Sequence, residues 1–360
     1  MQGEAAGLRQ SRKLDHIRYC LQSEDGPGAT GFADISLIHN CLPDLDLAAI
    51  DLQTEVAGLR LSSPIILNAI TGGTSDVTEL NRKLACAART CDIPMAVGSQ
   101  AAAIQDSSVR ESFSVVRKEN PDGIIIANVG ANTCPDAVFL AVDMIKADAL
   151  QIHLNVAQEL TMPEGDRNFQ GYTKNIKHIT QALAIPVIVK EVGFGMAREQ
   201  IAELSNLGVT AIDIGGCGGT NFAMIETARG SKQASGFLNA WGISTACSII
   251  EALAGSKTNV DIIASGGVRT AEDIIKALAL GSKAAGIAAP CLQILINEGL
   301  EALTSFIQRL QYELRCIMLL TGAANIKSLQ TKPVVIIGNT GQWLQLRGID
   351  LTQFAQRPNK

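Results

Sequence analysis

The densest group of polar residues able to do chemistry lies at residues 151–169, in the stretch QIHLNVAQELTMPEGDRNF. His153 and Asn155 are two positions apart, so both point to one face if this stretch begins as a strand. Gln158 and Glu159 follow within one helical turn. A carboxylate among amides and an imidazole can hold Mg²⁺ in a mostly hydrated shell, especially where substrate phosphates complete it. A solvated loop with a core histidine is the alternative, and the clustering favours the metal and substrate site.

Lys190 is a second candidate, because it ends the apolar run IPVIV at residues 185–189. An ammonium at the end of a buried strand costs several kcal/mol of desolvation unless an anionic group lies nearby. Glu191 follows it, but neighbouring side chains on a strand point to opposite faces. Two partners stay open: the carboxylate of Asp213 on the next apolar run, or the carbonyl edge of a flavin ring, whose negatively charged reduced form a lysine stabilises.

Glycines mark a third candidate site. Gly266 and Gly267 follow one apolar run, and Gly286 lies in the last one. Glycine lets backbone N–H groups approach an anion closely, and the N-terminus of a following helix adds a favourable dipole. One pair alone is typical of a tight turn, whereas two such sites after adjacent final strands predict phosphate binding.

These candidates are positioned by a unit that recurs along the chain: an apolar run, a loop with glycine or asparagine, and a stretch with helical spacing. The eight apolar runs lie at residues 64–70, 93–99, 123–130, 149–155, 185–193, 209–216, 260–267 and 284–290. Continuous apolar strands that alternate with helices indicate a parallel sheet covered on both faces. Eight repeats predict an α/β fold of the (β/α)8 TIM-barrel type, and the alternative is a doubly wound sheet with a second domain.

The barrel is expected at residues 61–330, preceded by an N-terminal extension at 1–60 and followed by a C-terminal tail at 331–360 packed on the barrel. Long helices within the last part of the barrel segment are expected to close it. Active sites of such barrels are built at the carboxyl ends of the strands, where all three candidates fall. The loop at residues 215–242 is unusually long, and long ordered loops at this end are usually functional.

Composition narrows the function classes. The 360-residue chain is 47% apolar and 18% charged with a net charge of −5, which favours a globular protein and argues against a nucleic-acid or anionic-membrane surface. The sequence has neither an apolar stretch long enough to cross a bilayer nor a signal-peptide core, which predicts a cytoplasmic location. Nine cysteines without a CxxC pair indicate free thiols rather than a disulfide framework or a zinc site.

Several segments together resemble the type 2 isopentenyl-diphosphate isomerases, a flavin-dependent family. The matching segments are RKLDHI, NAITGGT, VGSQ, ANVG, QIHLNVAQELTMPEGDRNF, IVKEVGFG, DIGGCGGTNF, WGIST and ASGGVRT. They follow the family's order from residue 12 to about residue 290, and the pattern HLNxxQExxMPEGDR is specific. The resemblance implies a barrel that binds FMN and Mg²⁺ and interconverts isopentenyl diphosphate and dimethylallyl diphosphate in isoprenoid biosynthesis.

The family's motifs, carried over residue by residue, imply a role for each matching position. The flavin would contact Ala69, Ile70, Thr71, Ser99, Asn128, Lys190 and Thr220. The flavin phosphate would contact Gly267, Val268, Arg269, Ile287 and Ala288. The small-molecule diphosphate substrate would contact Arg12 and Lys13 of the N-terminal extension, and Ser99, Gln100, His153, Asn155, Gln158 and Trp241. The implied metal ligand is Glu159.

The resemblance also implies a mechanism of proton addition and elimination without net redox change. Gln158, Lys190 and His153 are the implied catalytic residues: Gln158 lies over the alkene, and Lys190 balances the charge of reduced FMN. NADPH would serve only to reduce the flavin, and the protein would be a homo-oligomer, a tetramer or an octamer. Two positions depart from the family: Ala101 stands where many members have an arginine that grips the diphosphate, and Ile70 replaces a common methionine.

Two other functions compete with this interpretation. An FMN-dependent 2-hydroxy-acid oxidase needs a histidine base in the loop after the sixth strand, and residues 215–242 contain none. A barrel that binds a phosphometabolite without catalysis is the second, and the presence of Gln158, Glu159 and Lys190 argues against it.

Overall fold

The eight apolar runs form the strands of one closed parallel barrel in the computed structural model, which describes residues 26–230, 236–255 and 260–358. The barrel strands are β4 (Ile65–Leu67), β5 (Met95–Ala96), β6 (Ile125–Gly130), β7 (Ala149–Leu154), β8 (Val187–Glu191), β9 (Ala211–Asp213), β10 (Asp261–Ala264) and β11 (Ala284–Ile287). The pairing of β11 with β4 closes the cylinder. The predicted (β/α)8 barrel is therefore confirmed, and the doubly wound alternative is wrong.

One buried residue from each strand fills the lower interior of the barrel. In the order of the strands around the barrel, these residues are Ile263, Ala284, Ile66, Ala96, Ile126, Ala149, Ile188 and Ala211. Isoleucine and alanine therefore alternate around the whole cylinder, so each large isoleucine side chain has a small alanine on both neighbouring strands. This packing fills the barrel below the site and leaves its other end for polar groups.

A hairpin closes the amino-terminal end of the barrel. It consists of β2 (Thr54–Val56) and β3 (Leu59–Leu61), and Val56 and Leu61 belong to the same buried cluster as the interior layer. The hairpin is tied to the barrel because the hydroxyl of Thr54 donates to the carbonyl oxygen of Lys283 at 3.0 Å. The opposite, carboxyl-terminal end of the barrel is the end at which the candidate residues lie.

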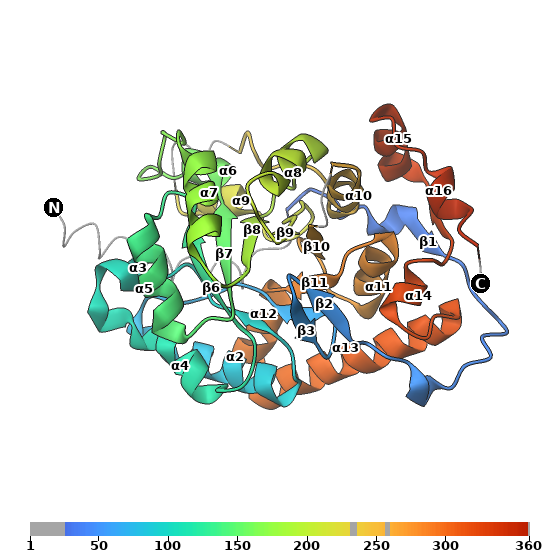
Figure 1. Ribbon diagram of the computed structural model, residues 1–360, viewed down its shortest axis with the longest axis horizontal. Helices are drawn as coiled ribbons and strands as arrows, with labels where there is room; N and C mark the ends of the chain where they lie inside the picture. Colours follow the sequence, from blue (N-terminus) through green and yellow to red (C-terminus); the bar gives the residue numbers. More distant parts are fainter. Residues whose placement is uncertain (1–25, 231–235, 256–259, 359–360) are drawn as a thin grey trace.

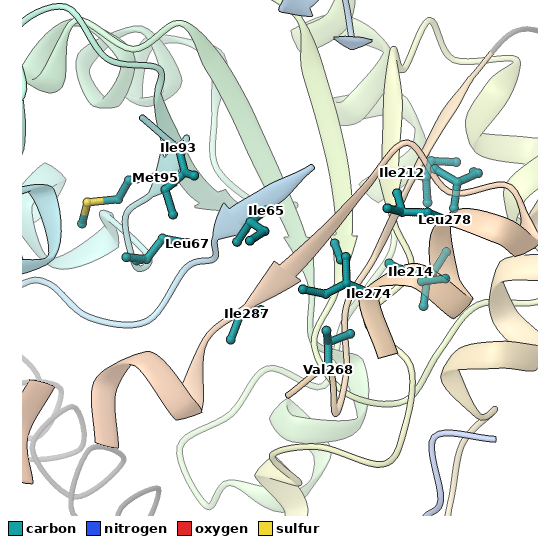
Figure 2. Packing of buried hydrophobic residues seen from close by; sticks show 14 of the residues in the cluster. Ile65, Leu67, Ile93, Met95, Ile212, Ile214, Val268, Ile274, Leu278 and Ile287 are labelled. Carbon is teal, nitrogen blue, oxygen red and sulfur yellow. The ribbon is translucent and has the colours of Figure 1, made fainter. Parts of the chain in front are cut away.

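Helices surround the barrel (Figure 1). They are α2 (Thr78–Thr90), α3 (Ala101–Gln105), α4 (Glu111–Glu119), α5 (Pro135–Ile145), α6 (Val156–Thr161), α7 (Tyr172–Ala182), α8 (Arg198–Ser205), α9 (Phe222–Ala228), α10 (Thr245–Gly255), α11 (Ala271–Leu280), α12 (Ala289–Asn297), α13 (Leu300–Thr321) and α14 (Ile326–Leu329). Figure 2 shows the packing that holds them: Ile274 and Leu278 of α11 belong to the same buried cluster as Ile212 of β9. The spacing of Ile274 and Leu278, four residues apart, places both on one face of the helix.

Two strands from the N-terminal and C-terminal parts of the described chain pair with each other outside the barrel. Strand β1 (Ile35–Leu37) pairs antiparallel with β12 (Val334–Ile336), which is followed by α15 (Gly338–Leu346) and α16 (Thr352–Ala355). Arg347, at the end of α15, donates at 2.7 Å to the fully buried carboxylate of Glu251 on α10. Among the residues that the structure describes, no helix combines the length and the apolar character needed to span a membrane.

Candidate active site

A buried carboxylate organises the carboxyl-terminal end of the barrel. Asp213, the last residue of β9, has no exposed surface. It accepts hydrogen bonds from the ammonium of Lys190 at 2.9 Å, from Nδ2 of Asn68 at 2.8 Å, and from the hydroxyl of Ser265. A longer contact of 3.4 Å comes from the backbone N–H of Gly215. Asp213 thus links strands on different sides of the barrel mouth.

Lys190 pairs with this carboxylate, so the Asp213 alternative is confirmed. The register of the sheet explains the contact, because Lys190 on β8 lies directly beside Asp213 on β9. The ammonium also donates to the hydroxyl of Ser265 at 3.0 Å, and the lysine side chain is 11% exposed. Since an ammonium has three N–H donors and the described residues accept two, a contact with a flavin edge is compatible with this pair and stays a prediction.

Three buried amides continue the network from Asp213 across the barrel mouth to His153. Oδ1 of Asn68 accepts from Nε2 of Gln151 at 3.2 Å, and Oε1 of Gln151 accepts from Nδ2 of Asn128 at 3.1 Å. Oδ1 of Asn128 lies 2.9 Å from Nδ1 of His153. The predicted residues Asn128, His153 and Lys190 are therefore joined through one continuous chain of hydrogen bonds.

Gln100 belongs to the wall of the site rather than to its opening. Its side chain is fully buried, its Oε1 accepts from the backbone N–H of Asn128 at 3.0 Å, and its Nε2 donates to the carbonyl oxygen of Ala141 at 2.9 Å. Both ends of the amide are therefore used inside the protein. In the described structure the side chain of Gln100 holds the backbone of Asn128, and its expected substrate contact stays a prediction.

The stretch at residues 151–169 brings its polar residues together as expected. Asn155 precedes α6, and its Nδ2 donates to Oε1 of Glu159 at 2.8 Å. Oε2 of Glu159 accepts from the backbone N–H of Asp166 at 2.8 Å, which ties the following loop to the helix. Gln158 lies on the same helix and is 9% exposed.

The metal expected at Glu159 stays a prediction. Within the described part of the chain, histidine, cysteine, aspartate and glutamate form no group of three or more that could hold a metal ion.

The glycine loops after β9 and β10 pack backbone against backbone. Gly266 and Gly267 have φ of +100° and +74°, and a Cβ on Gly267 would overlap the carbonyl oxygen of Gly218. Only glycine allows this approach. The described residues leave the backbone N–H groups of Gly267, Val268 and Ala288 without acceptors, and these lie after the adjacent strands β10 and β11. Such a cradle fits a phosphate.

One expected phosphate donor is already engaged. The backbone N–H of Arg269 donates to the carboxylate of Asp273 at 3.0 Å, and Thr270 and Asp273 form the capping box that begins α11. A phosphate contact by Arg269 would therefore come from its guanidinium rather than from its backbone.

The remaining predicted residues lie around the same barrel mouth. The hydroxyl of Thr71 donates to Asn81 at 2.5 Å, so it faces the barrel wall. The backbone N–H of Ala69 donates to Asn68. The half-buried residues are Ala69, Ile70, Ser99, Arg269, Thr220 and Ala288, and the side chain of Ile287 is buried. Trp241 is 65% exposed, and Arg12 and Lys13 lie outside the described residues.

Four residues of the network were not predicted as site residues: Asn68, Gln151, Asp213 and Ser265. The sequence signal that could have identified them is a polar residue inside or directly after an apolar strand. Burying such a residue costs free energy unless its polar group is paired. Asp213 was considered only as a partner for Lys190. Its additional contacts with Asn68 and Ser265 join segments that are far apart in the sequence.

Glu191 ends β8, and the loop that follows encloses its carboxylate. Oε2 accepts from the backbone N–H groups of Gly193 at 2.7 Å, Phe194 at 2.5 Å and Gly195 at 3.2 Å. Burial raises the pKa of Glu191 to about 7, although these hydrogen bonds and the charge of Lys190 act in the opposite direction. Glu191 and Lys190 point to different surroundings, as the alternation of side chains along a strand predicts.

This raised pKa predicts a pH-dependent contribution to stability. Between pH 4.5 and about pH 7 the folded protein keeps a proton on Glu191 that the unfolded chain releases, so the free energy of unfolding falls as the pH rises. The contribution is complete below this window and lost above it. Glu191→Gln should remove a difference on the order of 1–3 kcal/mol between acidic and alkaline conditions, measured by urea unfolding. Exposed Glu301→Gln is the control, and an unchanged difference in Glu191→Gln would contradict the assignment.

Comparisons with known proteins identify relatives of the whole chain. The family of FMN-dependent dehydrogenases matches residues 27–336. The isopentenyl-diphosphate delta-isomerase of Symbiobacterium thermophilum is 46% identical over 362 residues, covering 98% of this chain and 99% of that protein. The protein of the same name from Geobacillus sp. is 50% identical over 350 residues, covering 97% and 99%.

Solved structures support the fold. A structure of mandelate oxidase has a TM-score of 0.65 at 16% sequence identity, covering 89% of this chain and 95% of that chain. At this identity the likeness shows the barrel fold alone. The two relatives named as isomerases, in contrast, match almost every part of the chain at close to half identity. The chain belongs to the isopentenyl-diphosphate delta-isomerase family, within the broader family of FMN-dependent dehydrogenases.

Proposed function

We propose that the protein is an isomerase that interconverts isopentenyl diphosphate and dimethylallyl diphosphate in isoprenoid biosynthesis, using reduced FMN and Mg²⁺. The observation that carries the proposal is the polar network at the barrel mouth, which contains the Lys190–Asp213 pair and, on the strand next to Lys190, His153. A cradle of backbone N–H groups around Gly267 lies at the same end. The names of the relatives support the choice of substrate.

The residues present fit an FMN. Gly267, Val268 and Ala288 offer backbone N–H groups for its phosphate, with Arg269 and Ile287 beside them. The third donor of Lys190 suits the carbonyl edge of the ring, and further contacts would come from Ala69, Ile70, Thr71, Ser99, Asn128 and Thr220. When bound and reduced, a flavin supplies a protonated N5 and an electron-rich face, and NADPH would serve only to reduce it.

The diphosphate would bind beside the imidazole of His153 and the amide of Asn155. By the family's motifs, Arg12 and Lys13 of the N-terminal extension, residues 1–60, add positive charge, and Trp241 lines the pocket. Ala101 adds no charge, so the binding of the diphosphate would depend more on the metal than in relatives with arginine there. The C-terminal tail, at residues 331–360, would complete the outer wall of the barrel domain.

The reaction adds a proton at one carbon of the substrate and removes one from another. An alkene is a very weak base, so charge that develops on it must be stabilised by groups already in position. Gln158 on α6 is 9% exposed, and its amide could bind at the alkene without introducing a charge that would need a counterion. Lys190 would stabilise the negative charge of the reduced flavin ring.

Glu159→Gln is expected to raise the Mg²⁺ concentration for half-maximal activity by roughly 10-fold to 100-fold, because the variant keeps the shape of the side chain and loses its charge. The affinity for FMN should not change. Glu164→Gln, an exposed carboxylate in the same loop, is the matched control. If Glu159→Gln titrates with Mg²⁺ as the wild type does, Glu159 is not the metal ligand.

The experiment that tests the proposed function is an isomerisation assay on the purified full-length protein. The protein is incubated with FMN, a chemical reductant, Mg²⁺ and isopentenyl diphosphate, and dimethylallyl diphosphate is measured. Product is expected only when reduced flavin and Mg²⁺ are both present. A parallel assay with 2-hydroxy acids tests the oxidase alternative, and turnover there without isomerisation would overturn the proposal. The tetramer or octamer and the cytoplasmic location stay predictions.

A further inference from the structure

We propose that Asp213 on β9 is a positioning residue for His153, which lies two strands away on β7. The carboxylate sets the direction of every hydrogen bond in the relay that runs through Asn68, Gln151 and Asn128. The last member of the relay then requires the proton of a neutral His153 ring to be on Nδ1. The relay would thus select one of the two tautomers of the imidazole.

The first step of the relay is fixed at two places. Asp213 accepts from Lys190 and Ser265, and as a carboxylate it can only accept from Asn68 as well, so the amide nitrogen of Asn68 must face it at 2.8 Å. The backbone N–H of Ala69 can only donate, and it lies 2.9 Å from Oδ1 of Asn68. If the amide were flipped, its oxygen would face the carboxylate of Asp213 and its NH2 group would face the N–H of Ala69. Both contacts would be repulsive, so Asn68 has one orientation.

The orientation of Asn68 determines the next two amides. Oδ1 of Asn68 accepts from Gln151 at 3.2 Å, so the amide nitrogen of Gln151 faces Asn68 and its oxygen faces Asn128. Nδ2 of Asn128 then donates to Gln151 at 3.1 Å, and its oxygen faces His153. The exposed fractions of Asn68, Gln151 and Asn128 are 2%, 1% and 3%, so bulk water has little access to replace one of these bonds.

The histidine at the end of the relay must therefore donate from Nδ1. Nδ1 lies 2.9 Å from Oδ1 of Asn128, and an amide oxygen can only accept. In the neutral ring, Nε2 is then unprotonated and can only accept a hydrogen bond. Gly130 leaves space beside this nitrogen, because a Cβ there would come within 3.3 Å of Nε2.

This tautomer has a consequence that rests on the proposed function. With its proton held on Nδ1, the neutral His153 ring presents Nε2 as an acceptor, which suits a metal-bound water rather than a phosphate oxygen. Donation from Nε2 to a diphosphate oxygen requires a second proton on the ring. The relay would thereby keep His153 from binding a diphosphate as a neutral donor.

The test is the ¹⁵N NMR spectrum of histidine-labelled full-length protein, with and without FMN, at alkaline pH where imidazoles are neutral. The signals of His153 are those that disappear in His153→Gln, which separates them from His16, His39 and His178. The expected result is a pyrrole-type signal from Nδ1 and a pyridine-type signal from Nε2. The reverse assignment would overturn the proposal.

Two further variants test whether the relay is the cause. Gln151→Leu interrupts the relay and should give a mixture of both tautomers. Adding Asn128→Asp to this variant should restore the Nδ1 proton, because a carboxylate beside Nδ1 can only accept. Gln311→Leu removes a glutamine hydrogen bond to Cys91 on the outside of the barrel and should leave the His153 signals unchanged.

An unchanged tautomer in a folded Gln151→Leu protein would also overturn the proposal. If Gln151→Leu fails to fold, the wild-type spectrum still decides the tautomer. The measurement needs no diphosphate substrate and no turnover, so its failure is distinguishable from a failure of the proposed isomerase function.

Discussion

Replacing Lys190 with methionine is expected to lower the free energy of unfolding of the flavin-free protein by about 3–5 kcal/mol. Asp213 is fully buried, and without the ammonium its charge would keep, among the described residues, the hydroxyl of Ser265, the amide of Asn68 and a distant backbone N–H as partners. Breaking a buried ion pair at one side leaves an uncompensated charge, which costs more than the pair itself contributes. Urea unfolding measures the effect.

The matched control is Lys83→Met. Lys83 is a lysine of α2 whose side chain is 38% exposed and lies 3.7 Å from the carboxylate of Glu79. Its loss should change the free energy of unfolding by less than about 1 kcal/mol, because exposed ion pairs contribute little. The double variant Lys190→Met/Asp213→Asn should be more stable than Lys190→Met alone, since it removes the orphaned charge. Equal effects of Lys190→Met and Lys83→Met would contradict the buried pair.

Gly267→Ala is expected to weaken FMN binding by roughly 100-fold, equal to about 2.7 kcal/mol. The φ of Gly267 is +74°, and a Cβ there would overlap the carbonyl oxygen of Gly218, so the loop after β10 must move away from the loop after β9. This movement displaces the N–H groups of Gly267 and Val268 that the phosphate would contact. Fluorescence quenching of FMN on titration with the flavin-free protein measures the affinity.

Gly348→Ala separates backbone strain from steric overlap. Gly348 has a φ of +75°, almost the same as Gly267, but a Cβ on it would meet no atom within 4 Å. The control variant should therefore lose only about 1–2 kcal/mol of stability from the left-handed conformation and bind FMN as the wild type does. If Gly267→Ala also keeps the wild-type affinity, the phosphate does not bind at this loop.

The fold was predictable because its signal is local and repeated. Each strand lies in a short apolar run, and the alternation with helices indicates a parallel sheet. Some strands were predicted to be longer than they are: the apolar run at residues 64–70 contains β4, which covers only Ile65–Leu67. The residues just beyond a strand are also apolar or small in this chain, so composition alone does not mark where the pairing stops.

The site was only partly predictable because its contacts are long-range. Sequence places Lys190 at a strand end, but the choice of Asp213 as its partner depends on the register between β8 and β9. Asn68 and Asp213 are 145 positions apart, so no local pattern links them. Gln100 was expected to contact the substrate, and the direction of its side chain follows from the N–H donor of Asn128 and the carbonyl acceptor of Ala141, which no local pattern indicates.

The central claim is that a flavin bound at this barrel mouth supports isomerisation without net oxidation or reduction. The most direct test reduces the FMN-loaded protein once, in deuterated water, and counts dimethylallyl diphosphate formed per reducing equivalent. We expect many product molecules for each equivalent, with deuterium incorporated into the product. A yield of one product per reducing equivalent, or a protein that does not bind FMN, would contradict the account.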